Sequence, residues 1–277
     1  MAGITITELW VYPVKSLKGI ALQEAQLTTA GLAHDRRWML VDKKGKFMSQ
    51  RGIPRMALIE TALTETHLLL NCQGQDTLAI PLDCQHLSNQ EAGEAKVWKD
   101  DVQVLDEGDE AANWLSNFLG KTVRLVRMAE NFERPQSSPD LLGAETHTYF
   151  ADAAPLLICN QRSLDTLNEA LVAKGFGAVP MNRFRPNIVI DGLPAFQEHT
   201  LKTLSQASIS LTFCYACERC VMTIIDQSNG TKHPDWEPYR TLTSINPMPS
   251  NPKAPAFGEN MIVAEGAGQC LKVGDVV

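Results

Sequence analysis

Short strand-like runs separated by turn residues recur along the whole chain, and this pattern limits the fold more than any other feature. Leu68–Leu70 and Leu78–Ile80 flank a turn at Gly74, and Lys96–Trp98 and Val102–Leu105 flank another. Many short strands with such turns are typical of β-barrels and β-sandwiches. Further runs of this kind are Ile4–Ile6, Trp38–Asp42 with Phe47–Met48, Ile188–Ile190, Ile209–Phe213, Val221–Ile225, Met261–Val263 and Leu271–Val277. We therefore expect a mainly β protein.

Two segments show helical spacing instead. Apolar residues recur every three or four positions in Asp109–Leu119, and Gly120 is a suitable C-terminal cap. A second helix is expected to begin at Ser163, a good N-cap, and to end before Gly175. Residues 131–139 are rich in Pro and Ser and read as a linker, and residues 246–252 read as a loop. The sequence thus predicts two domains, 1–125 and 130–277, with a few helices.

Composition excludes several classes of protein. With 277 residues, 44% of them hydrophobic and 21% charged, the chain has the usage of an ordinary globular protein. A formal net charge of -7 and the lack of basic blocks argue against nucleic-acid binding. No signal peptide and no apolar run long enough to span a membrane are evident. Seven cysteines, an odd number, suit reduced thiols, so we expect a cytoplasmic protein.

Three of these cysteines, Cys214, Cys217 and Cys220, follow each other at threefold spacing. On an extended strand this spacing turns successive side chains to opposite faces, so one strand cannot direct all three to one ion. On a loop the spacing would suit part of an iron-sulfur site with Cys270, or a structural zinc site, and both readings stay open. The remaining cysteines, Cys72, Cys84 and Cys159, suit plain packing.

Cys220 follows Arg219, a cation that favours the thiolate form a metal requires. Other cationic and hydrogen-bonding side chains lie far away in the sequence, in positions where turns or prolines display them. These candidates for holding a phosphorylated ligand are Lys15, Ser16, Arg36, Arg185 and Asn187. One thiolate together with several groups that bind anions indicates a metal-bearing organic cofactor.

Asp152 is a lone carboxylate in an apolar stretch, where it either caps a short turn or handles protons beside a metal. The six histidines show no paired metal-binding spacing. The chain also lacks the GxSxG, GxxxxGK and GxGxxG motifs of serine hydrolases, nucleotide triphosphatases and Rossmann enzymes.

Taken together, the motifs resemble those of the MOSC (molybdenum cofactor sulfurase C-terminal) family, and closely the subgroup with an N-terminal MOSC barrel that includes the mitochondrial amidoxime-reducing component. The resemblance covers nearly the whole chain, and the order and spacing of its motifs make it specific. The matching stretches are Tyr12–Gly19, Gly31–Val41, Arg185–Ile190, Cys217–Cys220 and Lys272–Asp275.

This resemblance implies an N-terminal MOSC β-barrel packed against a MOSC core β-barrel, with molybdenum cofactor in its molybdopterin form at the seam. It implies that Cys220 is the protein ligand of molybdenum, that Lys15, Ser16, Arg36, Arg185 and Asn187 hold the pterin and its phosphate, and that Asp152 lies near the metal. Ala153 and Ala154 stand where the amidoxime-reducing relatives have hydroxyl residues, so some contacts there are expected to be replaced or lost.

The resemblance implies an oxidoreductase that reduces small N-hydroxylated compounds. Some bacterial relatives carry a C-terminal ferredoxin domain that is not found before Val277, so we expect electrons from a separate ferredoxin-like protein, flavin reductase or cytochrome. Two alternatives remain. One is a cofactor carrier or sulfur-transfer protein that uses Cys220 without turning over a substrate, and the other is an iron-sulfur or zinc structural protein.

Overall fold

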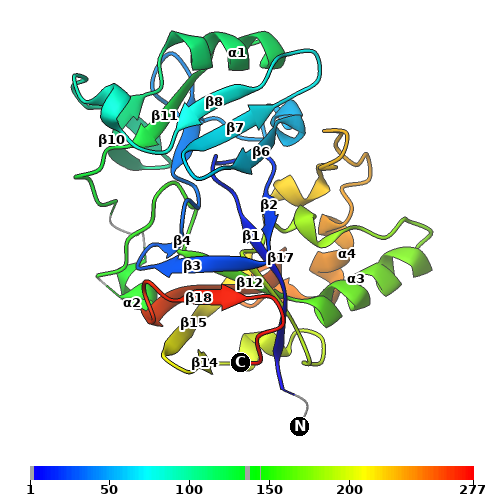
Figure 1. Cartoon of the computed structure of the whole chain (residues 1–277). Helices are drawn as coiled ribbons and strands as arrows, with labels where there is room; N and C mark the ends of the chain where they lie inside the picture. The colour runs from blue at the N-terminus through cyan, green and yellow to red at the C-terminus, as the bar shows by residue number, and fades with distance from the viewer. Residues whose placement is uncertain (1–2, 135–137, 144) are drawn as a thin grey trace.

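The computed structural model describes residues 3–134, 138–143 and 145–277. Strands dominate, as expected, and curl into two β regions that lie one above the other in Figure 1. Among the described residues no helix is long and apolar enough to cross a membrane.

The elements follow the chain in a simple order. The strands are β1 (Thr5–Val11), β2 (Ile20–Leu22), β3 (Glu24–Thr28), β4 (Gly31–Leu32), β5 (Trp38–Val41), β6 (Glu60–Leu63), β7 (His67–Asn71), β8 (Leu78–Pro81), β9 (Gly93–Val97), β10 (Asp100–Asp106), β11 (Arg124–Met128), β12 (Leu156–Asn160), β13 (Ile188–Asp191), β14 (Thr203–Gln206), β15 (Ile209–Glu218), β16 (Pro247–Met248), β17 (Asn251–Glu265) and β18 (Cys270–Lys272). The helices are α1 (Asp109–Leu119), α2 (Pro139–Leu142), α3 (Gln161–Ala173) and α4 (Tyr239–Ile245), with short 3-10 turns η1 (Pro54–Leu58), η2 (Gln85–Leu87), η3 (Met181–Arg183), η4 (Gln197–Thr200) and η5 (Val221–Ile224).

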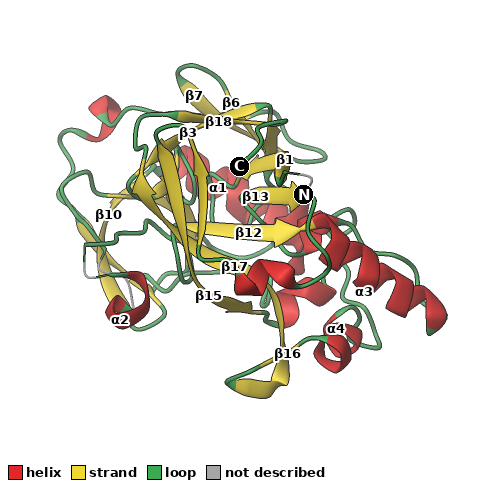
Figure 2. Ribbon diagram, turned by 90° about the horizontal axis from the view of Figure 1, so that it is seen from below, coloured by secondary structure: helices red, strands yellow, loops and turns green. Residues whose placement is uncertain are grey.

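The larger region is built on one eight-stranded sheet. Its strand order is β14-β15-β17-β12-β13-β1-β2, with β16 paired to β17. All pairs are antiparallel except β12 and β13, which α3 joins as a parallel crossover. Apolar side chains from both ends of the chain, such as Ile6, Leu27, Ile158 and Met261, form its buried core. Figure 2 shows α3 and α4 together beside this sheet.

The smaller region holds the four-stranded sheet β5-β11-β10-β9 and the three-stranded sheet β6-β7-β8. Helix α1 packs its buried face, including Leu115, against Leu40, Leu68 and Leu70. The predicted helix is confirmed, and Gly120 ends it in the left-handed conformation with φ 65°. The predicted antiparallel pairings of β7 with β8 and of β9 with β10 are also present.

The first strands of the chain belong to the larger region. Ile6 on β1 pairs with Ile190 on β13, and Thr5 forms a bridge with Val276 near the other end of the chain. The division into domains 1–125 and 130–277 stays a prediction. The large sheet contains strands from both of these ranges, with β1 and β2 from the first. Part of the predicted linker, 135–137, lies outside the described residues.

Some local predictions were wrong. Val221–Ile225 was expected to be a strand, but Val221–Ile224 forms η5, because the chain leaves β17 after Arg219 and buries Ile224 and Ile225 against Ala57. Helix α3 begins two residues before Ser163 and is capped by Asn160, whose side chain accepts from the Arg162 amide at 3.1 Å.

Two other segments near the C-terminus also differ. The expected loop at 246–252 contains β16, which folds back on β17. The expected strand at 271–277 is shorter, since β18 ends at Lys272 in a turn where Gly274 has φ 95° and Asp275 accepts from the Lys272 amide.

Candidate functional site

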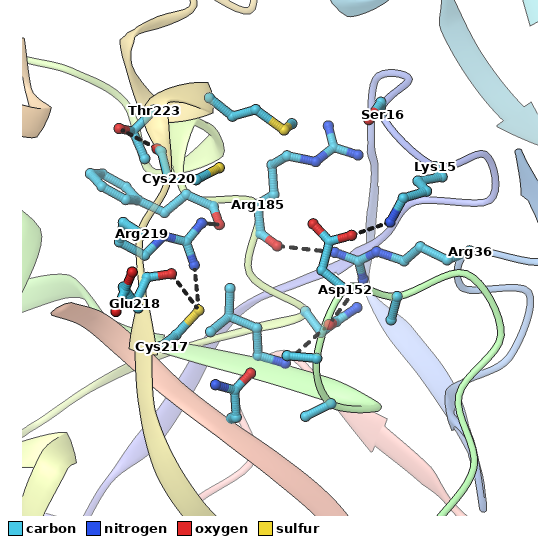
Figure 3. A pocket seen from close by; sticks show the side chains of 18 of the residues that line it. Lys15, Ser16, Arg36, Asp152, Arg185, Cys217, Glu218, Arg219, Cys220 and Thr223 are labelled. Atoms are coloured by element: carbon cyan, nitrogen blue, oxygen red, sulfur yellow. Dashed lines mark hydrogen bonds and ion pairs between the residues drawn. The ribbon is translucent and has the colours of Figure 1, made fainter. Parts of the chain in front are cut away.

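One pocket brings together all seven residues that the sequence singled out. Its lining includes Lys15, Ser16, Arg36, Asp152, Arg185, Asn187 and Cys220. They come from five separate connections: after β1, between β4 and β5, before β12, before β13 and after β15. In Figure 3 the cysteine segment and the group around Lys15 and Asp152 lie on opposite sides of Arg185. Their proximity fits the predicted roles, which remain predictions.

Cys220 presents an exposed thiol at this pocket. It stands between the end of β15 and the start of η5, where the Thr223 amide donates to its carbonyl oxygen at 3.2 Å. Arg51 approaches the Cys220 Sγ to 3.6 Å from the smaller region. A thiol that is accessible, next to a cation and at the end of a rigid strand is well placed to bind a metal or a reactive group.

Cys214 and Cys217 both lie on β15, in the extended segment that the sequence analysis considered. Only Cys217 lines the pocket, and the Cys214 thiol donates to the Thr212 carbonyl instead. Within the described part of the chain, no three His, Cys, Asp or Glu side chains come close enough to share a metal ion. The segment therefore does not bring together the ligands that an iron-sulfur or a zinc site would need.

Arg219 interacts electrostatically with its neighbour Cys220, but its hydrogen bonds go to other groups. Its Nη1 donates to the Cys217 Sγ at 2.9 Å, and its Nη2 donates to the Phe184 carbonyl at 2.5 Å. Burial raises the pKa of the Cys217 thiol, and the nearby Arg219 guanidinium opposes this rise. Arg51 is the cation that lies within 3.6 Å of the Cys220 Sγ, and no local motif in the sequence indicated it.

Asp152 is held by two partners and is not the lone carboxylate suggested by its apolar neighbours in sequence. Lys15 Nζ forms an ion pair with it and also donates to the Phe150 carbonyl at 2.7 Å, and Trp98 Nε1 donates to the same carboxylate at 3.0 Å. The Asp152 side chain is 48% exposed, and its partial burial works against ionisation, but the Lys15 charge and hydrogen bond outweigh this effect and lower its pKa. Asp152 is therefore ionised at neutral pH and accepts hydrogen bonds.

Arg36 and Arg185 form the cationic centre of the pocket. Both guanidinium groups lie over the buried Tyr12 ring, at 4.4 Å and 4.2 Å from its centroid. Arg36 forms an ion pair with the buried Asp35. Burial lowers the pKa of Arg185 to about 10, which leaves it charged at neutral pH.

Three of the site residues have left-handed backbones. The φ angles of Ser16, Arg36 and Arg185 are 67°, 48° and 55°. Such conformations are uncommon for residues other than glycine and cost free energy, so they gather where function requires a fixed geometry. Two of the three, Arg36 and Arg185, carry cations and line the same pocket.

Asn187 contributes by fixing the wall of the pocket. Its Oδ1 accepts from Arg36 Nη1 and from the Leu157 amide, both at 3.1 Å, and its Nδ2 donates to the Trp10 carbonyl at 3.2 Å. Asn187 is buried and thus ties β1, β12 and Arg36 together. Its donors were expected to meet a ligand directly, but the carbonyl of Trp10 occupies one of them.

The pocket fits an anionic, metal-bearing group on the chemistry of its donors. Arg185 forms no ion pair within the described residues and supplies positive charge, Lys15, Arg36 and Arg183 add cations that are paired with carboxylates, and Cys220 supplies a thiol from the other side. The buried Nε atoms of Arg183 and Arg219 have no hydrogen-bond partner within the described residues, although both side chains line the pocket. Buried donors without partners are rare in folded proteins, and these two mark the wall of the pocket as unusual.

Sequence reasoning missed several lining residues, among them Arg51, Trp98 and Asn260. Arg183 was noticed only as part of the cationic segment 183–187 and was not chosen as a site residue. Arg51 and Trp98 belong to the smaller region, and only the packing of the two regions brings them to Cys220 and Asp152.

Comparisons with known proteins identify the family of this chain. Residues 3–122 match the model of the MOSC N-terminal beta barrel domain, and residues 145–277 match that of the MOSC domain. The chain is 33% identical to mitochondrial amidoxime reducing component 2 of Bos taurus, over 99% of this chain and 82% of that protein.

Two further relatives are also similar to most of the chain. It is 31% identical to mitochondrial amidoxime-reducing component 1 of Homo sapiens, again over 99% of this chain and 82% of that protein. It is also 31% identical to the molybdenum cofactor sulfurase of Danio rerio, over 87% of this chain and 30% of that longer protein. The chain therefore belongs to the MOSC family, with a MOSC N-terminal β-barrel domain preceding its MOSC domain.

Proposed function

We propose that this protein binds molybdenum cofactor and reduces N-hydroxylated compounds, with electrons supplied by a separate protein. The observation that carries the proposal is the exposed Cys220 thiol facing a pocket lined by Lys15, Arg36 and Arg185. The likeness to two amidoxime-reducing components over almost the whole chain supports the same conclusion.

Each residue has a task that follows from its chemistry. Cys220 would supply the protein ligand to molybdenum, since thiolates bind such metals well. Arg36 and Arg185 would hold the phosphate with planar donor groups, and Ser16 and Asn187 would shape the wall around the pterin. When bound, the cofactor supplies a metal that exchanges two electrons with the substrate.

Reduction of an N-hydroxyl group consumes two electrons and two protons, and it yields an N–H group and one water molecule. Asp152 is ionised and therefore can accept a hydrogen bond from the N-hydroxyl group and orient it. Lys15 lies against this carboxylate and is the nearest proton-bearing side chain to it, and burial lowers the pKa of Lys15. A lowered pKa makes Lys15 a better proton donor to water or substrate at neutral pH.

The electron donor would be a ferredoxin-like protein, a flavin reductase or a cytochrome. The sequence carries no fingerprint for a flavin or nicotinamide, and the described residues hold no cluster of three metal ligands that an iron-sulfur centre would need. A cytoplasmic location stays a prediction.

The test is to purify the protein from a host that makes molybdenum cofactor, and to measure molybdenum content, pterin fluorescence and reduction of benzamidoxime by reduced viologen. We expect molybdenum near one atom per chain and turnover. Zinc or iron alone, or fully loaded protein that does not turn over, would refute the proposal.

The second candidate is a cofactor carrier or a sulfur-transfer protein. The exposure of Cys220 and the similarity to a molybdenum cofactor sulfurase favour it. Loaded protein that hands its cofactor or a Cys220-bound sulfur to an acceptor, but never reduces an N-hydroxyl group, would support this candidate.

A further inference from the structure

A second hollow adjoins the cofactor pocket and shares Arg51, Trp98 and Asp152 with it. Its volume is about 820 Å³. A cavity of roughly 150 Å³ is enough to hold benzene. The second hollow thus offers room for an aromatic group whose polar end would reach the shared residues.

Two aromatic side chains form one wall of this hollow. The rings of Phe47 and Trp98 lie 5.0 Å apart and are tilted by 54°. Trp98 is 47% exposed and has φ 57°, an unusual conformation for a bulky residue. Its indole N–H is tied to Asp152, so the ring is held in place, and the part of its surface that Phe47 and Arg51 do not cover stays exposed. A fixed, exposed indole is a suitable surface for stacking.

Arg51 connects this wall to the thiol. Its guanidinium lies 4.5 Å from the centre of the Trp98 ring, and Nη1 reaches the Cys220 Sγ at 3.6 Å. A planar group that stacks on Trp98 would therefore lie beside Arg51 with its polar end toward Cys220. In this position an N-hydroxyl group would also face Asp152.

The charges around the second hollow are mainly positive. Its two carboxylates, Asp100 and Asp152, are paired with Arg134 and Lys15. Lys46, Lys99 and Arg51 line it as well and form no ion pair within the described part of the chain. Uncompensated cations repel a positively charged molecule and attract a negative one.

We infer that the second hollow binds the ring of flat aromatic N-hydroxylated compounds that are neutral or anionic, with Phe47 and Trp98 as the stacking wall and Arg51, Lys46 and Lys99 as the selecting charges. This inference rests on the proposed function for the reaction itself. It adds the substrate class and the residues that distinguish it.

The stacking wall is tested by Trp98→Leu against Trp236→Leu. Trp236 is a matched control because it is also 47% exposed, has φ 63° and lines neither hollow. The readout is the ratio of kcat/KM for benzamidoxime to that for acetamidoxime, so any effect of losing the Asp152 hydrogen bond cancels. We expect Trp98→Leu to lower this ratio about 3- to 10-fold, mainly through KM, and Trp236→Leu to leave it unchanged.

A second variant, Trp98→Phe, keeps a ring and loses the indole N–H. It should preserve most of the aromatic preference. An equal ratio in wild type, Trp98→Leu and Trp98→Phe would overturn the stacking wall.

The charge selection is tested by the double substitution Lys46→Gln and Lys99→Gln, with Lys202→Gln and Lys253→Gln as the control at exposed positions outside both hollows. The readout compares benzamidoximes that carry a 4-carboxylate or a 4-trimethylammonium group. We expect the preference for the carboxylate to fall several-fold in the first pair and not in the second. No change in the first pair would overturn the selecting charges.

Measuring the binding of substrates without turnover tests this inference separately from the proposed function. Calorimetric titration with benzamidoxime and acetamidoxime, in the absence of any electron donor, measures the hollow alone. Aromatic preference that depends on Trp98 in a protein that never reduces these compounds would refute the function and support the inference. Turnover with no aromatic preference in either assay would support the function and refute the inference, and no binding of either compound would also refute the inference.

Discussion

Arg185→Lys is the sharpest single test of the cationic centre, because it keeps the charge and removes the planar fork. Arg185 already has φ 55°, and lysine meets the same backbone constraint as arginine, so the change is confined to the side chain. The guanidinium donates to the carbonyl of the buried Leu17 at 2.7 Å and stacks on Tyr12 at 4.2 Å. An ammonium group cannot make both contacts at once.

The expected magnitude follows from these two contacts. A hydrogen bond from a charged donor contributes about 1.5 to 3 kcal/mol, and a guanidinium on an aromatic ring contributes about 0.5 to 1 kcal/mol. Because lysine can keep only one of them, Arg185→Lys should destabilise the cofactor-free protein by about 0.5 to 3 kcal/mol. Burial also lowers the pKa of Arg185, and the same burial acting on a lysine would favour the neutral form, which weakens anion binding further.

The assays are urea unfolding of the cofactor-free protein and molybdenum content after expression in a cofactor-competent host. The matched control is Arg162→Lys on α3, where the side chain is 56% exposed and pairs with Asp165 at 3.8 Å. An exposed pair of this kind contributes at most about 1 kcal/mol, so the control should change little. If Arg185→Lys changes the unfolding free energy by no more than Arg162→Lys does, and molybdenum content stays the same, our reasoning about this centre is wrong.

Three further predictions concern the thiol, the carboxylate and the electron supply. Cys220→Ala should abolish molybdenum retention, whereas Cys270→Ala, at another exposed cysteine, should retain it, and equal metal content in the two purified variants would contradict the ligand assignment. The pKa of Asp152 is lowered in the folded state, so its ion pair stabilises the protein above about pH 4, the unfolded value, and this contribution is lost as the pH falls. The difference in unfolding free energy between wild type and Asp152→Asn should therefore shrink from pH 6 to pH 3, and a constant difference would speak against the pair. The loaded protein should be inert with NADPH alone and should reduce benzamidoxime with reduced viologen, as followed by product formation; activity with NADPH and no carrier would count against a separate donor.

Local patterns in the sequence were enough to predict many of the strands and the two longest helices. Alternating apolar residues with turns between them gave the β7-β8 and β9-β10 pairs, and helical spacing with Gly120 gave α1. These signals depend on neighbours a few residues apart, so no knowledge of the fold was needed to read them. The sequence also indicated the chemistry of Cys220, Arg36 and Arg185, because residue type and the neighbouring proline are local properties.

The exceptions show where tertiary structure overrode local preference. Val221–Ile224 is rich in β-branched residues, as strands are, yet it turns as η5, and Ile224 packs with Ile225 on Ala57. Ser163 is a good N-cap by type, but its hydroxyl donates to the buried Glu198 carboxylate at 2.8 Å, which leaves Asn160 to cap α3.

The assembly of the site was decided by tertiary structure alone. Packing of the smaller region on the large sheet brings Arg51 to Cys220 and Trp98 to Asp152, across 169 and 54 residues of sequence. Neither contact leaves a trace in local periodicity, because it depends on how two sheets meet and not on the residues next to each partner. The sequence by itself therefore determined which chemical groups the protein has and on which elements they stand, and the packing of the two regions determined which of these groups share one pocket.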